Sequence, residues 1–282
     1  MFAKLNLILE FKMDFWAKIL EILDAEMTTP TMYGWFHILW LVLSIGVAVL
    51  LCYLYKKGYI KNVRGVVLTV AITVIILEIY KMINFGFSYK EGIQYNFPWG
   101  SFPWQFCSMP MYVGLIAGIT KGKVHDWCCA FLATFAVFAG AAVMLYPSTV
   151  FIPTIGINIQ TMICHGSMIT LAIFLYYTNH VKTEFKTLWK AIPVFSICVG
   201  IAIILNEVGH KVGLTEEHYF NMFYISRHED PHLPVYSNIQ NAVNYPWCLF
   251  IYIIGFSAAA CLMLLAAMGI KKIGAIGNKN TN

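Results

Sequence analysis

Charged residues are scarce in this chain. Only 12% of its 282 residues are Asp, Glu, Lys or Arg, whereas 59% are hydrophobic, and the mean hydropathy is +0.68. A soluble domain carries about 25% charged residues and about 45–50% apolar ones. The chain therefore has more apolar surface than one water-soluble core could bury, and we expect the bilayer to be the solvent for much of it.

Cysteine motifs, repeats and low-complexity segments are absent as well. The eight cysteines form no C-x-x-C pair, and their spacing matches no secreted disulfide framework. His and acidic residues gather in the longest hydrophilic stretch, 207–244, but solvated loops are often rich in such residues. We therefore predict no metal ion and no other cofactor, and we expect most of the cysteines to pack as small hydrophobes.

Long apolar stretches dominate what is present. A helix needs about 20 mostly apolar residues to cross about 30 Å of hydrocarbon, and backbone polar groups in lipid must be satisfied within the segment. Stretches of about this size lie at 33–55, 63–85, 103–120, 127–146, 158–178, 191–205 and 245–270. They predict an all-α polytopic bundle of about seven transmembrane helices.

Lys and Arg occupy every second loop between these stretches. Cytoplasmic loops collect basic residues, so the alternation predicts a multi-pass protein of the cell membrane with a cytoplasmic C-terminus and an extracytoplasmic N-terminus. The formal charge of +5 is then an orientation signal, and we expect no nucleic-acid partner. The basic loops contain Lys56, Lys57, Lys61 and Arg64; Lys121 and Lys123; Lys182, Lys186 and Lys190; and Lys271, Lys272 and Lys279.

The two ends of the chain differ from the apolar part. In residues 1–30, the apolar residues can share one face of a helix, and the charged residues would then leave the other face exposed to water. The segment has neither the long apolar core nor the cleavage site of a signal peptide. We expect an N-terminal amphipathic helix over 1–30, a transmembrane domain over 31–272 and a cytoplasmic tail over 273–282.

Polar residues inside the apolar stretches are candidate functional residues, because an ionisable side chain in hydrocarbon is costly. Glu78 and Lys81 stand one helical turn apart and can form an ion pair. Counted along the expected spans, they lie in the outer half of the bilayer with Asn206, Cys107 and His165. The cytoplasmic halves are almost entirely aliphatic and aromatic. This distribution predicts a site in the outer half.

Cys107 and His165 can support nucleophilic catalysis. Cys107 lies between two prolines that are expected to begin and kink a helix. A thiol in the first turn of a helix, or next to a His, ionises more readily. His165 could serve as general base and then general acid. Packing roles remain the alternative for both residues, and Cys164 and Ser167 are weaker candidate nucleophiles.

Four short segments are similar to a known family. Residues 103–108 resemble its L-P-L-H-L-C-S segment, 164–166 resemble H-H-G, 221–224 resemble N-Y-M-F, and 245–247 resemble a proline-aromatic segment. From about residue 34 to residue 268, the chain thus resembles the bacterial YwaF-type integral membrane proteins and their eukaryotic relative, a transmembrane acyltransferase of ether phospholipids.

This resemblance implies that Cys107 accepts an acyl chain as a thioester and that His165 assists. The chain departs from the pattern at Gln105, where a His is common, and at Cys164, which replaces the first His of the H-H-G segment. An amide side chain or a backbone N–H near the nucleophile could donate to the oxyanion. The residues that we expect to contact substrate are Glu78, Lys81, Gln105, Asn206, Asn221, Tyr245 and Trp247.

The expected function is that of a membrane-embedded lipid acyltransferase. It would pass an acyl chain between phospholipid and lysophospholipid at the outer leaflet. A transporter or small-molecule-binding protein could use the same polar cavity, although the broken helices and repeats typical of transporters are not evident. A lipid hydrolase, with water as the acceptor, is the other alternative.

Overall fold

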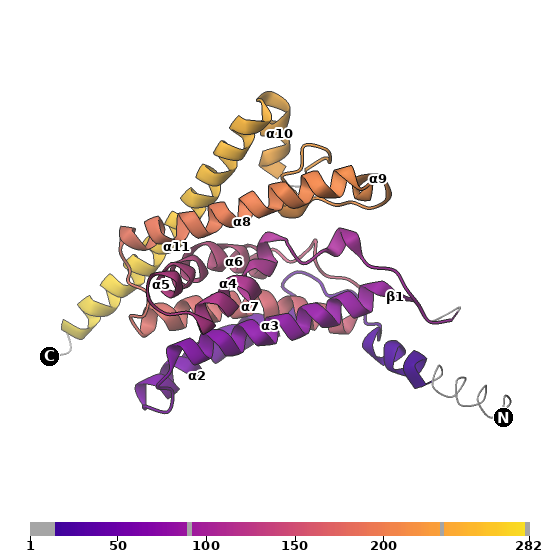
Figure 1. Ribbon diagram of the computed structural model, residues 1–282. Coiled ribbons are helices and arrows are strands. Elements are labelled where there is room, and N and C mark those ends of the chain that lie inside the picture. Colours follow the sequence, from indigo (N-terminus) through magenta and orange to yellow (C-terminus); the bar gives the residue numbers. More distant parts are fainter. Residues whose placement is uncertain (1–14, 89–91, 232–233, 280–282) are drawn as a thin grey trace.

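A computed structural model describes residues 15–88, 92–231 and 234–279 (Figure 1). Within these residues, six helical segments are long and apolar enough to cross a membrane. One of them begins as α5 (Gly122–Phe131), passes through the π-helical turn η3 (Leu132–Ala136) and ends as α6 (Val137–Leu145). The other five are α2 (Trp35–Lys56), α3 (Val63–Gly86), α7 (Ile155–Tyr177), α8 (Phe185–Lys211) and α11 (Tyr245–Lys279). The prediction of an all-α polytopic bundle is confirmed.

The apolar stretch 103–120 forms a shorter helix than the other six. It begins with the 3₁₀ turn η2 (Phe106–Ser108) and continues as α4 (Met109–Ile119). Pro110 occupies the first turn of α4, where its missing N–H costs no hydrogen bond, so it starts this helix and does not kink it. Residues 96–105 therefore cross part of the bundle as irregular chain with one 3₁₀ turn, η1 (Trp99–Ser101).

The helices pack around the segment that contains the π-helical turn. In Figure 1, α3 runs beside α4, and α11 crosses α8 at the side of the bundle. Phe131, Phe135 and Phe195 are fully buried between these elements and stack on one another. Large apolar side chains on the outward faces, such as Val42 and Ile76, are exposed in the isolated chain. Such faces are expected where lipid is the solvent.

Residues 15–23 form a helix that belongs to the expected N-terminal amphipathic segment; residues 1–14 lie outside the described part. The chain that follows it is attached to the bundle, since Met27 N–H donates to Pro153 O and the Tyr80 hydroxyl donates to Leu23 O. At the other end, α11 continues to Lys279, through residues that were expected to form a tail. Two short strands, β1 (Phe87–Ser88) and β2 (Gln94–Tyr95), pair in antiparallel fashion.

The prediction of a hydrophilic loop over 207–244 is wrong for its middle part. After α9 (Leu214–Glu217), residues 219–226 turn back into the bundle; we call this segment the inserted loop. Phe220, Met222, Phe223 and Ile225 are at most 2% exposed. The loop contains the 3₁₀ turn η4 (Met222–Tyr224) and is followed by α10 (Pro234–Ala242). Its apolar residues explain the burial, since they join the largest cluster of buried side chains.

Side chains from the bundle satisfy the backbone of the inserted loop. Asn206 accepts from Met222 N–H at 2.7 Å and donates to Met222 O at 3.0 Å. Gln105 accepts from Phe223 N–H at 3.0 Å and donates to Asn221 O at 2.9 Å. Irregular backbone at membrane depth is tolerated only where protein satisfies it in this way.

We expect Asn206→Ala or Gln105→Ala to destabilise the inserted loop. Each substitution leaves one buried N–H, that of Met222 or Phe223, without its acceptor, at a cost of about 1–3 kcal/mol, and removes one of the two donors to a neighbouring carbonyl. Thermal unfolding of the purified protein in detergent measures the change. Asn241→Ala is a control outside the inserted loop. Equal melting temperatures for all three variants and the parent would contradict the assigned role.

Candidate functional site

Cys107 and His165 lie at the same depth in the bundle. Cys107 precedes the last residue of α4, Ile119, by twelve positions, and His165 precedes the last residue of α7, Tyr177, by the same number. At about 1.5 Å per residue, both lie about 18 Å from those helix ends. The ends lie near each other, because His125, in the helix α5 that follows α4, contacts His180, in the loop that follows α7.

A chain of polar contacts links α3 to α7 at this depth. Lys81 and Glu78 form an ion pair across one turn of α3, and their side chains are 19% and 7% exposed. Gln160 of α7 donates to Glu78 Oε2 at 3.4 Å and also approaches Cys164 Sγ at 3.5 Å. The ion pair predicted from the spacing is thus formed, and it is turned into the bundle.

Cys107 and His165 both interact electrostatically with this ion pair. Lys81 is within electrostatic range of Cys107 and also of His165. Cys164 is within electrostatic range of Cys107 as well. The Glu78–Lys81 ion pair thus lies within electrostatic range of both predicted catalytic residues, and α3, which carries it, packs against α4 and α7.

The environment of His165 fixes the tautomer of its ring. Its Nδ1 lies 2.8 Å from Thr161 O, a carbonyl that can only accept, so Nδ1 carries the hydrogen and Nε2 keeps its lone pair. Gly140 and Gly166 let α6 and α2 approach α7 here: a Cβ on Gly140 would meet His165 O at 2.7 Å, and one on Gly166 would meet Ser44 Oγ at 2.1 Å. His165 is buried and oriented like a general base.

Cys107 is more accessible than most of the cysteines. All eight lie in the described part of the chain, and only Cys107 and Cys261 are not fully buried. Cys107 occupies the η2 turn that precedes α4, at the start of a helix; Pro110 begins α4, whereas Pro103 lies in the irregular chain before it. Ser167, the alternative nucleophile, donates to Cys164 O within its own helix at 2.7 Å. This geometry favours Cys107 as the reactive side chain.

The amides Gln105, Asn206 and Asn221, together with Tyr245, lie at the inserted loop. Asn221 accepts from Ser226 N–H at 2.8 Å, and the Tyr245 hydroxyl donates to Ile225 O at 2.9 Å. In this structure the polar groups of these four side chains form hydrogen bonds to the backbone of the inserted loop. Trp247 is 61% exposed on the first turn of α11, outside the region where Cys107 and His165 lie.

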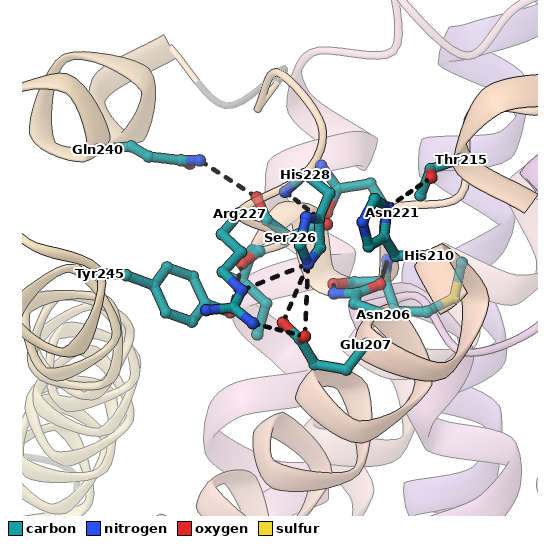
Figure 2. A network of polar contacts seen from close by, with 12 residues as sticks. Asn206, Glu207, His210, Thr215, Asn221, Ser226, Arg227, His228, Gln240 and Tyr245 are labelled. Carbon is teal, nitrogen blue, oxygen red and sulfur yellow. Dashed lines mark hydrogen bonds and ion pairs between the residues drawn. The ribbon is translucent and has the colours of Figure 1, made fainter. Parts of the chain in front are cut away.

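A second polar network surrounds the end of the inserted loop (Figure 2). Arg227 donates to Glu207 Oε2 at 2.8 Å, and His228 Nε2 lies 3.3 Å from Glu207 Oε1. The ring of His228 stacks on that of His210, with centroids 3.6 Å apart. A cavity of about 520 Å³ opens beside these groups. Its lining residues are Arg227, His228, Glu229, Asp230, Gln240, Asn241 and Tyr245.

Residues 228–232 read H-E-D-P-H, which matches the spacing of the H-E-x-x-H zinc motif. That motif binds zinc because a helix places both His side chains on one face. Here residues 227–229 form bends, Asp230 and Pro231 are irregular, and His232 lies outside the described residues. His228 contacts Glu207 and Arg227. The segment therefore lacks the helical geometry of a zinc-protease site.

Gln160 and Tyr224 are additional residues of the candidate site. Gln160 connects Glu78 to Cys164, and Tyr224 lies within electrostatic range of Cys107. Gln160 could have been found from the sequence, since it is a polar residue in an apolar stretch, one turn before Cys164. For Tyr224 the only signal was the resemblance of residues 221–224 to a family segment, because its stretch was otherwise expected to lie in water.

Comparisons with known proteins identify the family. A family model described as "TMEM164 family" matches residues 32–268, which is most of the chain. No curated protein and no solved structure matches the chain.

Proposed function

The chain belongs to the TMEM164 family, and from this premise we propose that it is a Cys/His-dependent lipid acyltransferase of the membrane. The observation that carries the proposal is that Lys81, paired with Glu78, lies within electrostatic range of both Cys107 and His165. The family is related to an ether-lipid acyltransferase, which supports the same chemistry. The substrates would be a phospholipid as donor and a lysophospholipid as acceptor.

In the first half-reaction, His165 Nε2 takes the proton of the Cys107 thiol, and the thiolate attacks the carbonyl carbon of an acyl ester. A C–S bond forms, the ester C–O bond breaks, and His165 returns the proton to the departing alkoxide. In the second half, His165 removes a proton from the acceptor hydroxyl, which attacks the thioester. The C–S bond then breaks, and the proton passes to the Cys107 sulfur.

The ion pair supports the ionic steps of this scheme. A thiolate and an oxyanion are costly in an apolar bundle, and the Lys81 ammonium supplies a positive charge near Cys107. Because Glu78 is paired with Lys81, the site has little net charge in the resting state. Glu78 and Lys81 are thus assigned to positioning substrate and charge, and not to covalent chemistry.

The cavity beside the inserted loop suits a polar headgroup. Arg227 and His228 line it together with Glu229 and Asp230, so it offers groups of both charges to a zwitterionic headgroup, and Arg227 follows Tyr224, which is within electrostatic range of Cys107, by three residues. Arg favours phosphate because its guanidinium matches phosphate oxygens in geometry and charge. A phospholipid could then place its phosphate in this cavity and an acyl ester at Cys107, on the side of the bundle opposite the basic loops.

Acyl transfer by the purified protein tests the proposal. With a labelled phospholipid and an unlabelled lysophospholipid in vesicles, we expect the label to move to the lysolipid and an acyl-like electrophile to modify Cys107. Cys107→Ala should abolish both. Cys261→Ser is the matched control, because Cys261 is the other cysteine that is not fully buried, and it should retain both activities.

Three outcomes would contradict the proposal. Transfer and labelling that persist in Cys107→Ala would remove the nucleophile. Label that appears only as free fatty acid, even with excess lysolipid, would indicate a hydrolase. Transport of a solute that survives Cys107→Ala but needs Glu78 and Lys81, without any acyl transfer, would favour a transporter that uses the same polar groups.

A further inference from the structure

A cluster of possible metal ligands lies at the end of the bundle opposite the inserted loop. His125 and Cys129 belong to α5, and His180 belongs to the loop between α7 and α8. Their nearest donor atoms all lie within 4.8 Å of one another. His125 is 7% exposed and Cys129 is 1% exposed. His180 is exposed and closes the cluster from the outside.

The helix and a backbone carbonyl orient two of the side chains. His125 and Cys129 are four residues apart, so they share one face of α5. His125 Nδ1 lies 2.7 Å from Ala117 O and therefore carries the hydrogen, which leaves the Nε2 lone pair free. Metal-binding histidines are held by such second interactions, which fix the tautomer and the ring orientation.

The distances within the cluster suit a tetrahedral ion. With Zn–N bonds of about 2.0–2.1 Å and a Zn–S bond of about 2.3 Å, a tetrahedral centre separates nitrogen from sulfur by about 3.6 Å. His125 Nε2 lies 3.6 Å from Cys129 Sγ. His180 Nε2 faces His125 Nε2 at 2.5 Å, so its ring must withdraw slightly to admit an ion. Because His180 is in an exposed loop, such a shift is feasible.

The surroundings of the cluster carry positive charge. Lys61, Arg64 and Lys121 line the adjacent cavity of about 350 Å³, and a thiolate at Cys129 would offset part of their positive charge.

We propose that His125, Cys129 and His180 bind one transition-metal ion of the zinc class. Two imidazoles and one thiolate are a donor set that Zn²⁺ prefers, and a water or small anion would complete the tetrahedron. On binding, the Cys129 thiol loses its proton to solvent and the sulfur forms the bond to the metal. The ion would attach the loop between α7 and α8 to α5.

Metal titration of the untagged, full-length protein in detergent tests this proposal. After treatment with a chelator, we expect one equivalent of Zn²⁺ to bind, and one equivalent of Co²⁺ to give the visible and near-ultraviolet bands of a tetrahedral cobalt–thiolate centre. Cys129→Ser should lose the thiolate band. His180→Ala and Cys129→Ser should weaken Zn²⁺ binding by at least about 100-fold, more than the roughly 10–100-fold cost of losing an outer-shell partner.

Two control variants make the test specific. Cys128→Ser changes the neighbouring buried thiol of α5, and His218→Ala removes a surface His at the other end of the bundle; both should bind Zn²⁺ like the parent. His180 is exposed, so His180→Ala should fold, which gel filtration can verify. A Co²⁺ complex without a thiolate band, or Zn²⁺ affinity unchanged in both Cys129→Ser and His180→Ala, would overturn the proposal.

Discussion

His165→Asn is expected to slow acyl transfer by about 10²–10⁴-fold, the usual contribution of a general base. The substitution is chosen because the Asn amide nitrogen can take the place of Nδ1 and still donate to Thr161 O. It retains the structural hydrogen bond and removes only Nε2, the atom that would accept the proton from Cys107. Steady-state transfer between labelled phospholipid and lysophospholipid measures the loss.

The pH dependence of this variant distinguishes catalysis from packing. Without a base, the thiol of Cys107 must ionise by itself, so transfer in His165→Asn should rise with hydroxide over a pH range in which the parent has reached its plateau. Modification of Cys107 by the electrophile should slow in parallel. His165→Gln should behave like His165→Asn. Full activity of His165→Asn would contradict a role of His165 as base. If His165→Gln were then inactive, the only role of this side chain would be its hydrogen bond to Thr161 O, which Asn preserves.

The helical bundle could be predicted from the sequence because a chain in lipid has few alternative secondary structures. An apolar stretch of about 20 residues in hydrocarbon must be helical, and the start of α3 at Val63 was predicted to the residue. The Glu78–Lys81 pair followed from helical spacing alone. The common depth of Cys107 and His165 was also predicted, because both positions were counted along helices of known rise.

The inserted loop could not be predicted from its own residues. Its apolar part is too short to be recognised as a membrane segment and is flanked by charged residues. Its burial depends on partners that are distant in sequence, Gln105 and Asn206, whose amides satisfy its backbone. The His125–Cys129–His180 cluster was missed for a similar reason, since His180 follows His125 by 55 residues and only the fold brings them together.

Lys81→Met is expected to destabilise the protein by about 3–5 kcal/mol, the usual cost of leaving one member of a buried ion pair unpaired. The side chain of Glu78 is only 7% exposed, and its other contact is a hydrogen bond of 3.4 Å from Gln160. That bond is too weak to replace the ammonium, so Glu78 must either remain charged in apolar surroundings or take up a proton. Reversible unfolding in mixed micelles measures the change.

Three matched variants distinguish the effect of the ion pair on stability from the effect of each single charge. Glu78→Gln should cost less than Lys81→Met, because Gln160 can still bond to the new amide and the 19%-exposed Lys81 can extend toward solvent. The double variant Glu78→Gln, Lys81→Met should recover most of the stability lost in Lys81→Met, since neither charge remains. Additive effects of the two substitutions would show that the charges are independent and hydrated. In that case Lys81 could not supply a localised positive charge to Cys107, and the role assigned to the ion pair in acyl transfer would fail with it.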